Sequence, residues 1–188
     1  MNSAPENLPP LQMGDAAVEL LLSDQRGQVQ SLKTWWQQGP LLLVFLRHVG
    51  CPLTRGWMEQ FKVEVADAAK SHGTIALVTM STPEQAATFR EAQQIPFVCL
   101  SDPQQTAYQA YGIPRGTLWQ ISQPAVWKEG LKGVLQCGVG AVQGDPFQLP
   151  GVVLIDTQGI IRFLHRSQHS ADWPQTADWL PLWQAISA

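Results

Sequence analysis

The feature that most constrains this chain is an apolar run that leads to a cysteine at the start of a helix. Residues Leu41–Leu46 are continuously apolar, which predicts a buried strand, and Cys51 follows after a short polar loop. Pro52 then opens a segment with apolar residues at helical spacing as far as about Lys70. A thiol at this junction faces the free N–H groups of the first helical turn, which favour the thiolate. We therefore predict that Cys51 is reactive rather than an inert buried cysteine.

The rest of the chain alternates strand-like and helix-like segments. Before the strand and helix described above, we expect a hairpin of Ala17–Leu22 and Gln28–Leu32 around a turn at Ser23–Gly27. After them we expect a strand at Thr74–Met80, a helix from a capped start at Ser81–Pro83 to about Gln94, a short strand at Phe97–Leu100 and a helix from Ser101–Pro103 to Tyr111. The chain then continues with a hairpin of Gly151–Ile155 and Ile160–Leu164 and a final helix with Trp179, Leu182, Trp183 and Ile186 on one face. This order predicts an α/β fold with a mixed central sheet and helices on both faces.

The length of 188 residues and the 45% hydrophobic content fit a single domain with a sizeable core. Residues 1–13 are rich in proline and lack periodicity, so we expect a tail there and one domain over residues 14–188. Glycines interrupt the pattern between about residues 116 and 146. We expect an insertion with a long loop in that range.

Charge and hydropathy limit the partners of this chain. Only 14% of the residues are charged, the net charge is -3, and there is no basic block, so a nucleic-acid partner is not expected. No stretch approaches the roughly 20 apolar residues of a membrane span, and the first residues lack the features of a signal peptide. We expect a soluble, cytoplasmic protein.

The three cysteines, Cys51, Cys99 and Cys137, are few, odd in number and far apart. This pattern argues against a disulfide framework and against a metal site. Cys99 lies inside an apolar segment and is expected in the core. Cys137 lies in the glycine-rich range, where it is either a resolving thiol for Cys51 or a coincidental surface cysteine.

Four segments, in their order and spacing, resemble the thioredoxin-like superfamily in its AhpC/TSA peroxiredoxin-like branch. They are Leu22–Gly27, Val44–Pro52, Leu100–Ile113 and Pro150–Gly159. More narrowly, Gly144–Gly151 together with Cys51 is similar to the peroxiredoxin-like 2 group. The resemblance implies a thioredoxin-like fold, cysteine-based redox chemistry without a bound cofactor, and an external thiol reductant such as thioredoxin or glutathione.

The resemblance also implies roles around the cysteine. Cys51 and Thr54 are the expected catalytic pair, with the Thr54 hydroxyl donating a hydrogen bond to the thiolate in a CxxT motif. His48 is a candidate base or charge partner, and Pro150 is expected as a cis proline packed opposite Cys51. The expected substrate-binding residues are Arg47, His48, Gly50, Pro52 and Pro150.

Three positions depart from the usual peroxiredoxin pattern. Peroxiredoxins carry a threonine three residues before the reactive cysteine and a proline four residues before that threonine, where this chain has His48 and Val44. They also tend to place an arginine before the glycine of the late strand, where this chain has Pro150. The groups that would orient a peroxide must therefore come from elsewhere, and Arg47 is a candidate if its side chain points inward.

We expect a thiol-dependent oxidoreductase or peroxidase-like antioxidant protein that acts on a peroxide or a disulfide. Its single nucleophilic cysteine, Cys51, would be resolved by Cys137, by a second subunit of a homodimer or by an external thiol. One alternative is a thioredoxin-like module that senses oxidation or binds a partner without turnover. Another is an endoperoxide reductase like the prostaglandin F synthase of the peroxiredoxin-like 2 group, although Thr54 replaces the second cysteine on which that group relies.

Overall fold

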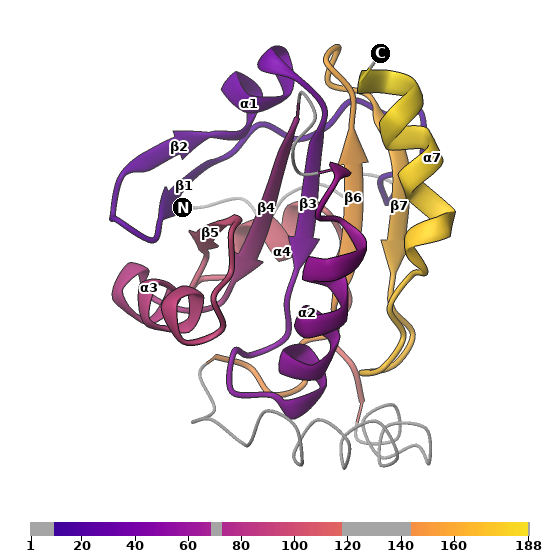
Figure 1. Ribbon diagram of the computed structural model, residues 1–188. Coiled ribbons are helices and arrows are strands. Elements are labelled where there is room, and N and C mark those ends of the chain that lie inside the picture. The colour runs from indigo at the N-terminus through magenta and orange to yellow at the C-terminus, as the bar shows by residue number, and fades with distance from the viewer. Residues whose placement is uncertain (1–9, 69–72, 118–143, 188) are drawn as a thin grey trace, which may run out of the picture.

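The structure, a computed structural model, describes residues 10–68, 73–117 and 144–187, and these residues form one central sheet with helices packed on it (Figure 1). The strands are β1 (Leu21–Asp24), β2 (Val29–Ser31), β3 (Leu41–Phe45), β4 (Thr74–Thr79), β5 (Val98–Ser101), β6 (Gly151–Ile155) and β7 (Ile161–Arg166). The helices are α1 (Leu32–Gln38), α2 (Pro52–Glu64), α3 (Pro83–Ala92), α4 (Thr106–Ala110) and α7 (Thr176–Ser187). The strand order is β2-β1-β5-β4-β3-β6-β7.

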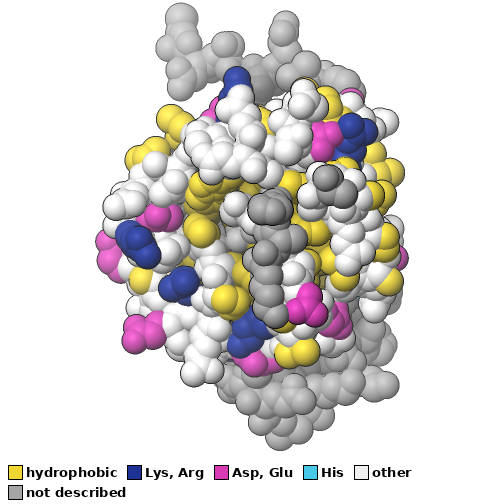
Figure 2. Space-filling model, turned by 45° about the horizontal axis from the view of Figure 1, so that its top comes forward, with side chains coloured by type: hydrophobic (Ala, Val, Ile, Leu, Met, Phe, Trp, Pro, Cys, Tyr) yellow, Lys and Arg dark blue, Asp and Glu magenta, His cyan; other side chains and the backbone are white. Residues whose placement is uncertain are grey.

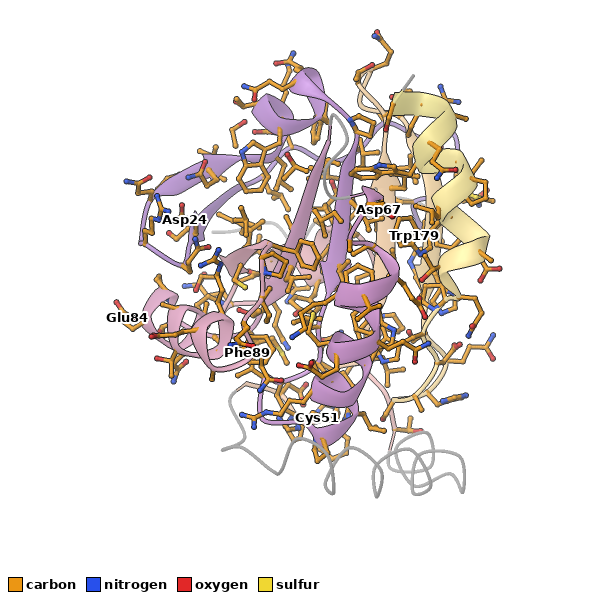
Figure 3. All side chains as sticks on the ribbon, viewed as in Figure 1. Asp24, Cys51, Asp67, Glu84, Phe89 and Trp179 are labelled. Atoms are coloured by element: carbon orange, nitrogen blue, oxygen red, sulfur yellow. The ribbon has the colours of Figure 1, made fainter. Side chains whose placement is uncertain are left out.

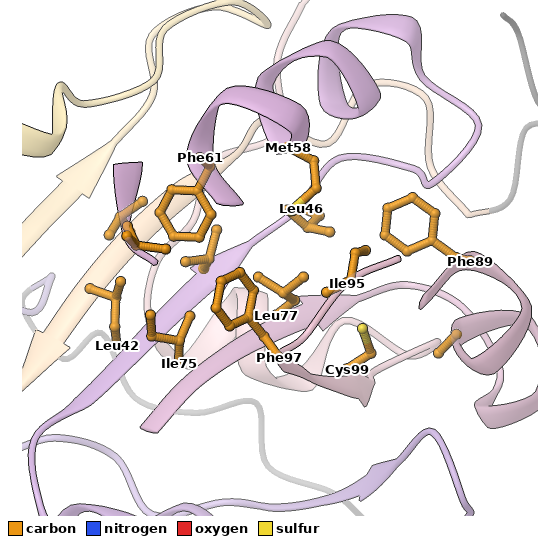
Figure 4. Packing of buried hydrophobic residues seen from close by; sticks show 14 of the residues in the cluster. Leu42, Leu46, Met58, Phe61, Ile75, Leu77, Phe89, Ile95, Phe97 and Cys99 are labelled. Atoms are coloured by element: carbon orange, nitrogen blue, oxygen red, sulfur yellow. The ribbon is translucent and has the colours of Figure 1, made fainter. Parts of the chain in front are cut away.

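Strand β3 lies inside the sheet, parallel to β4 and antiparallel to β6. Its side chains alternate between two apolar clusters, because successive residues of a strand point to opposite faces. Leu42 and Val44 belong to the cluster beneath α2, α3 and α7, and Leu43 and Phe45 belong to the cluster beneath α1 and α4. Figure 4 shows part of the first cluster, in which Met58 and Phe61 of α2 pack toward the sheet. The expected mixed sheet with helices on both faces is confirmed.

The expected N-terminal hairpin is present, but its first strand starts later than expected. Residues 17–20 are not part of β1. Ala16 instead bridges Ile160, and the Ala17 N–H donates to the carbonyl of Gly159. This segment is therefore held by the turn between β6 and β7, a distant partner that local strand propensity does not reveal.

Two helices differ from their expected bounds. Helix α2 ends at Glu64 rather than near Lys70, and residues 69–72 lie outside the described residues. Helix α4 begins at Thr106 rather than beside Ser101–Pro103, because the Asp102 carboxylate accepts the N–H groups of Thr106 (2.9 Å) and Ala107 (2.8 Å). The cap is thus supplied from further back along the chain than the usual N-cap position.

Helix α7 buries fewer residues than expected. Trp179 and Trp183 are buried against the core, whereas Leu182 is 40% exposed. The expectation that Leu182 shares the buried face is wrong. The two tryptophans, one turn apart, belong to the core cluster, and the partly buried Leu180 and Ile186 pack against it.

The helix start at Ser81–Pro83 follows the sequence closely. The Thr82 hydroxyl accepts the Gln85 N–H, and the Gln85 side chain accepts the Thr82 N–H, which makes a complete capping box. Pro83 occupies the first turn, where its missing N–H costs no hydrogen bond. This capping was expected from sequence alone, because all its partners are local.

The sheet brings two distant segments together at the end of β3. Phe45, the last residue of β3, pairs with Gly151, the first residue of β6. A Cβ at Gly151 would lie 2.7 Å from Cδ1 of Ile113 and 3.0 Å from the carbonyl oxygen of His165, so a side chain does not fit there without displacement. The close packing sets the residues just before β6 beside the loop that follows β3.

On the face shown in Figure 2, the coloured side chains form a mixture of apolar, polar and charged types. Lys and Arg side chains lie singly among apolar and acidic ones on the face shown. None of the helices in the described residues combines the length and the apolar character that crossing a membrane requires.

Candidate active site

Cys51 is the N-cap residue of α2, at the lower end of this helix in Figure 3. Its backbone is extended (φ -70°, ψ 126°), its N–H donates to the carbonyl of His48 (3.0 Å), and its carbonyl accepts the Arg55 N–H (3.1 Å). The side chain makes no capping bond to the helix backbone and is 4% exposed. The sulfur therefore lies at the positive end of the helix dipole, as expected from the sequence.

Arg47 points inward and contacts the sulfur. Its Nη1 donates to Sγ of Cys51 (2.8 Å), its Nε donates to the carbonyl of Gln148 (3.2 Å), and its Nη2 donates to the carbonyl of Pro146 (2.8 Å). The side chain is only 6% exposed. Within the described residues no carboxylate forms an ion pair with it. The guanidinium is thus a buried cation whose side-chain partner is the sulfur of Cys51.

The segment that receives Arg47 is itself anchored. The Gln148 side-chain nitrogen lies 2.9 Å from the carbonyl oxygen of Pro114 and 3.1 Å from that of Leu149. Asp145 pairs with Arg115, whose guanidinium also lies 4.8 Å from the centre of the Phe147 ring. Burial alone would raise the pKa of Asp145, but hydrogen bonds from Arg115 and the Phe147 N–H outweigh it and lower the pKa. These contacts fix the carbonyl groups that orient Arg47.

His48 is buried beside the cysteine but carries no charge. Burial, and then the positive charge of Arg47, lower the pKa of His48 to about 4. Its Nδ1 is buried and has no hydrogen-bond partner in the described part of the chain. With this pKa the imidazole is neutral near pH 7, which leaves the expected role as a base open, and the positive charge beside Cys51 is that of Arg47.

Thr54 occupies the third position of α2 and is fully buried. Its Oγ1 has no hydrogen-bond partner among the residues that the structure describes. The expected hydrogen bond from Thr54 to Cys51 is therefore absent, since Arg47 is the group that donates to the sulfur. Each unpaired buried polar atom costs roughly 1–3 kcal/mol of folding free energy, so the site carries two unfavourable groups, on His48 and Thr54.

Comparison with known proteins identifies the family. The profile of the AhpC/TSA family matches residues 13–164. The chain belongs to the AhpC/TSA family. This AhpC/TSA protein is 26% identical over 180 residues to human Peroxiredoxin-like 2C, covering 90% of this chain and 79% of the relative. The mouse Peroxiredoxin-like 2C is 24% identical over 167 residues, covering 84% of this chain and 74% of the relative.

Solved structures show the same fold. A thiol peroxidase from Chromobacterium violaceum superimposes with a TM-score of 0.67 at 17% identity, covering 94% of this chain and 88% of that one. The peroxidoxin BcpB from Mycobacterium tuberculosis superimposes with a TM-score of 0.64 at 21% identity, covering 95% of this chain and 99% of that one. The thioredoxin-like fold and the resemblance to the peroxiredoxin-like 2 group are thus confirmed.

The structure also places the remaining candidates of this AhpC/TSA protein. Gly50 is buried in the turn before Cys51, Pro52 is the first residue of α2, and Pro150 is buried directly before β6. Pairing of β6 with β3 brings Pro150 to the end of the sheet that carries Cys51. The described residues contain no cis peptide bond, so the expected cis geometry of Pro150 is wrong. A trans proline fits here because it lies before the first residue of the strand, where no backbone N–H is needed for a hydrogen bond within the sheet.

Cys99 is fully buried in the core beneath α2 and α3, as expected. Burial raises the pKa of this thiol to about 12, although Arg90 opposes the shift. Cys137 lies outside the described residues, as does most of the expected insertion. The described residues hold no group of three or more His, Cys, Asp or Glu side chains that could bind a metal ion.

Sequence analysis missed the carbonyl groups of Pro146 and Gln148, which orient Arg47. Every residue carries a carbonyl, so no residue type marks these two, and they lie 99 and 101 positions from Arg47. The one available signal was the proximity implied for Pro150, next to this segment. The guanidinium that contacts the sulfur is that of Arg47, in the loop after β3, and the residue before Gly151 is Pro150.

Proposed function

We propose that this protein is a thiol-dependent oxidoreductase of the peroxidase-like kind, in which Cys51 is oxidised by a peroxide or a disulfide. The observation that carries the proposal is the 2.8 Å contact between the buried Arg47 guanidinium and Sγ of Cys51. A cation in this position stabilises the thiolate, and the thiolate is the form that attacks oxygen or sulfur. The names of the related proteins, Peroxiredoxin-like 2C and thiol peroxidase, agree with this chemistry.

With a peroxide, the thiolate sulfur would attack one oxygen, forming an S–O bond as the O–O bond breaks. The sulfur loses two electrons and becomes a sulfenic acid, and the departing oxygen takes a proton and leaves as an alcohol or water. A second thiol would then condense with the sulfenic acid and release water. We assign this step to an external thiol of the glutathione or thioredoxin class, supplied by a reducing cytoplasm, with Cys137 or a second subunit of a homodimer as the alternatives.

The proposal is tested by trapping the oxidised sulfur. The protein is treated with one equivalent of hydrogen peroxide in the presence of dimedone, which labels sulfenic acids, and the labelled cysteine is located by mass spectrometry. We expect the label on Cys51, its loss in Cys51→Ser and its retention in Cys99→Ser. Labelling of Cys99 with Cys51 unmodified would contradict the proposal.

Turnover separates an enzyme from an oxidation sensor. Peroxide consumption is followed with glutathione or thioredoxin as the reductant, each regenerated by its own reductase. We expect many turnovers per Cys51 with at least one of the two reductants. A single turnover followed by a stable oxidised protein would favour the redox-sensing alternative instead.

A further inference from the structure

The backbone just before β6 forms a short ladder that leaves one carbonyl group for Arg47. Residues 114–116 lie antiparallel to residues 147–149, and backbone hydrogen bonds of 2.7 and 3.1 Å join the two segments on either side of Gln148. The carbonyl of Phe147 accepts one of these bonds. The carbonyl of the next residue, Gln148, instead accepts Nε of Arg47 (3.2 Å). The ladder therefore fixes the backbone of the residue that contacts the guanidinium.

The side chain of Gln148 anchors the same residue a second time. It is buried, and its Nε2 lies within hydrogen-bond distance of three carbonyl oxygens, those of Ile113 (3.3 Å), Pro114 (2.9 Å) and Leu149 (3.1 Å). An amide nitrogen carries two N–H groups, so carbonyl oxygens are the partners it requires. The residue that contacts Arg47 is thus held through its backbone and through its amide.

A second glutamine faces the oxygen of this amide. Nε2 of Gln105 lies 3.4 Å from Oε1 of Gln148 and 2.8 Å from Sδ of Met80. The backbone of Gln105 has a φ of 59°, in the left-handed region that residues other than glycine rarely adopt. Glycine would fit this backbone at lower cost, so a glutamine kept there indicates a role for its side chain.

We propose that Gln148 is a positioning residue for the reaction of Cys51, that it acts through Arg47, and that Gln105 fixes the orientation of its amide. The inference rests on the proposed function, because it assigns the residue that holds the activating guanidinium in place. The contacts form one chain, in which Arg47 joins Sγ of Cys51 (2.8 Å) to the carbonyl of Gln148, and the amide of Gln148 meets Gln105. Gln148 is uncharged, so its effect lies in the direction of the guanidinium.

The direction of the guanidinium matters because a hydrogen bond weakens steeply as its angle becomes poor. While the carbonyl of Gln148 holds Nε of Arg47, Nη1 stays aimed at the sulfur. With an apolar side chain in place of Gln148, the carbonyl loses its anchor and the guanidinium turns away for part of the time. The thiolate is then less stabilised near neutral pH, whereas at high pH, where thiols ionise without help, the sulfur reacts as before.

The experiment measures the second-order rate constant for alkylation of Cys51 by iodoacetamide at pH 7 and at pH 10, with the modified residue located by peptide mapping. The test variant is Gln148→Met, which keeps the length of the side chain and removes the amide. Gln105→Gly removes the second amide and suits the left-handed backbone. The matched control is Gln109→Met, at an exposed glutamine of α4. Each of the three changes is also combined with Arg47→Met.

We expect Gln148→Met to slow alkylation at pH 7 about fivefold, the effect of about one hydrogen bond. At pH 10, above the ordinary thiol pKa of about 8.5, its rate should lie within about twofold of the original protein's. Gln105→Gly should slow the reaction at pH 7 about twofold, because Gln148 keeps its contacts with the three carbonyl groups. Gln109→Met should match the original protein. In the Arg47→Met background none of these changes should slow the reaction further, because the two glutamines act through the guanidinium.

Two results would overturn the inference and leave the proposed function in place. One is a rate for Gln148→Met at pH 7 equal to that of the original protein; if this variant does not fold, the same result with Gln105→Gly decides. The other is a loss of rate that persists in the Arg47→Met background or is equally large at pH 10, which would mean that the glutamine supports the fold rather than the guanidinium. The proposed function fails on a different observation, the absence of a dimedone label on Cys51 of the unchanged protein.

Discussion

Nη1 of Arg47 lies 2.8 Å from Sγ of Cys51, and the same guanidinium binds the carbonyl groups of Pro146 and Gln148. One side chain therefore links the sulfur of Cys51 to a segment about a hundred residues away. Because the carbonyls fix the direction of the guanidinium, the sulfur meets a positive charge that is already oriented. The reactivity of Cys51 should depend on this arrangement as well as on its place at the start of α2.

The first prediction concerns the charge of Arg47. Arg47→Met keeps much of the apolar stem but removes the guanidinium, so the alkylation of Cys51 by iodoacetamide near pH 7 should slow about tenfold or more. The alkylation rate of Arg47→Lys should lie between those of the original protein and Arg47→Met, because an ammonium group keeps the charge but cannot reproduce the three directed hydrogen bonds. Arg26→Met, at an exposed turn residue, is the control and should alkylate at the original rate. Unchanged alkylation in Arg47→Met would show that the helix dipole alone activates the sulfur.

The second prediction distinguishes the two described cysteines. Burial raises the pKa of Cys99 to about 12, so this thiol should stay protonated and unlabelled by iodoacetamide at pH 8 in the folded protein. Peptide mapping after brief alkylation should find Cys51 modified and Cys99 free. Unfolding in guanidinium chloride should make both react. Equal labelling of the two thiols in the folded protein would refute the buried position of Cys99.

The third prediction concerns the pH dependence of stability. The pKa of His48 falls from an ordinary 6.5 to about 4 on folding, so the unfolded chain binds more protons between these values. Stability should be complete above pH 6.5 and should decrease as the pH falls toward 4. Through His48, the free energy of unfolding should fall by on the order of 2 kcal/mol over this pH range, after allowance for solvent screening of the ring.

Urea unfolding at pH 7, 6, 5 and 4 measures this effect. His48→Asn has no group that titrates there, so its free energy of unfolding should decrease less over the same window than that of the original protein. The difference between the two proteins, rather than either curve, isolates His48, because carboxylates also titrate near pH 4. Parallel curves would mean that the pKa of His48 does not change on folding.

The fourth prediction converts the single-cysteine site into a dithiol. Thr54→Cys places a thiol at the third position of α2, three residues from Cys51, where a thioredoxin-like CxxC motif has its second cysteine. After one equivalent of peroxide, this variant should lose two thiols and form an intramolecular disulfide, so that dimedone no longer labels Cys51. Thr54→Ser is the control and should keep dimedone labelling. Persistent labelling of Thr54→Cys would show that the second sulfur cannot reach the first.

Sequence alone determined the elements whose causes are local. The apolar run of β3, the start of α2 at Pro52, and the cap at Thr82 all follow from residues close to one another in the chain. The N-terminal position of Cys51 on α2 follows from the same local pattern. Local hydrogen bonds and side-chain periodicity need no distant partner, so these features could be predicted.

Only the tertiary structure decided what surrounds the sulfur. The pairing of Phe45 with Gly151 brings the residues before β6 against the loop after β3, and their carbonyl groups then turn Arg47 toward Cys51. The same packing buries His48 and lowers its pKa, and it leaves Thr54 without the hydrogen bond that the motif predicted. The two carbonyl groups that orient Arg47 lie about a hundred positions from it in the chain, so no local pattern could specify them.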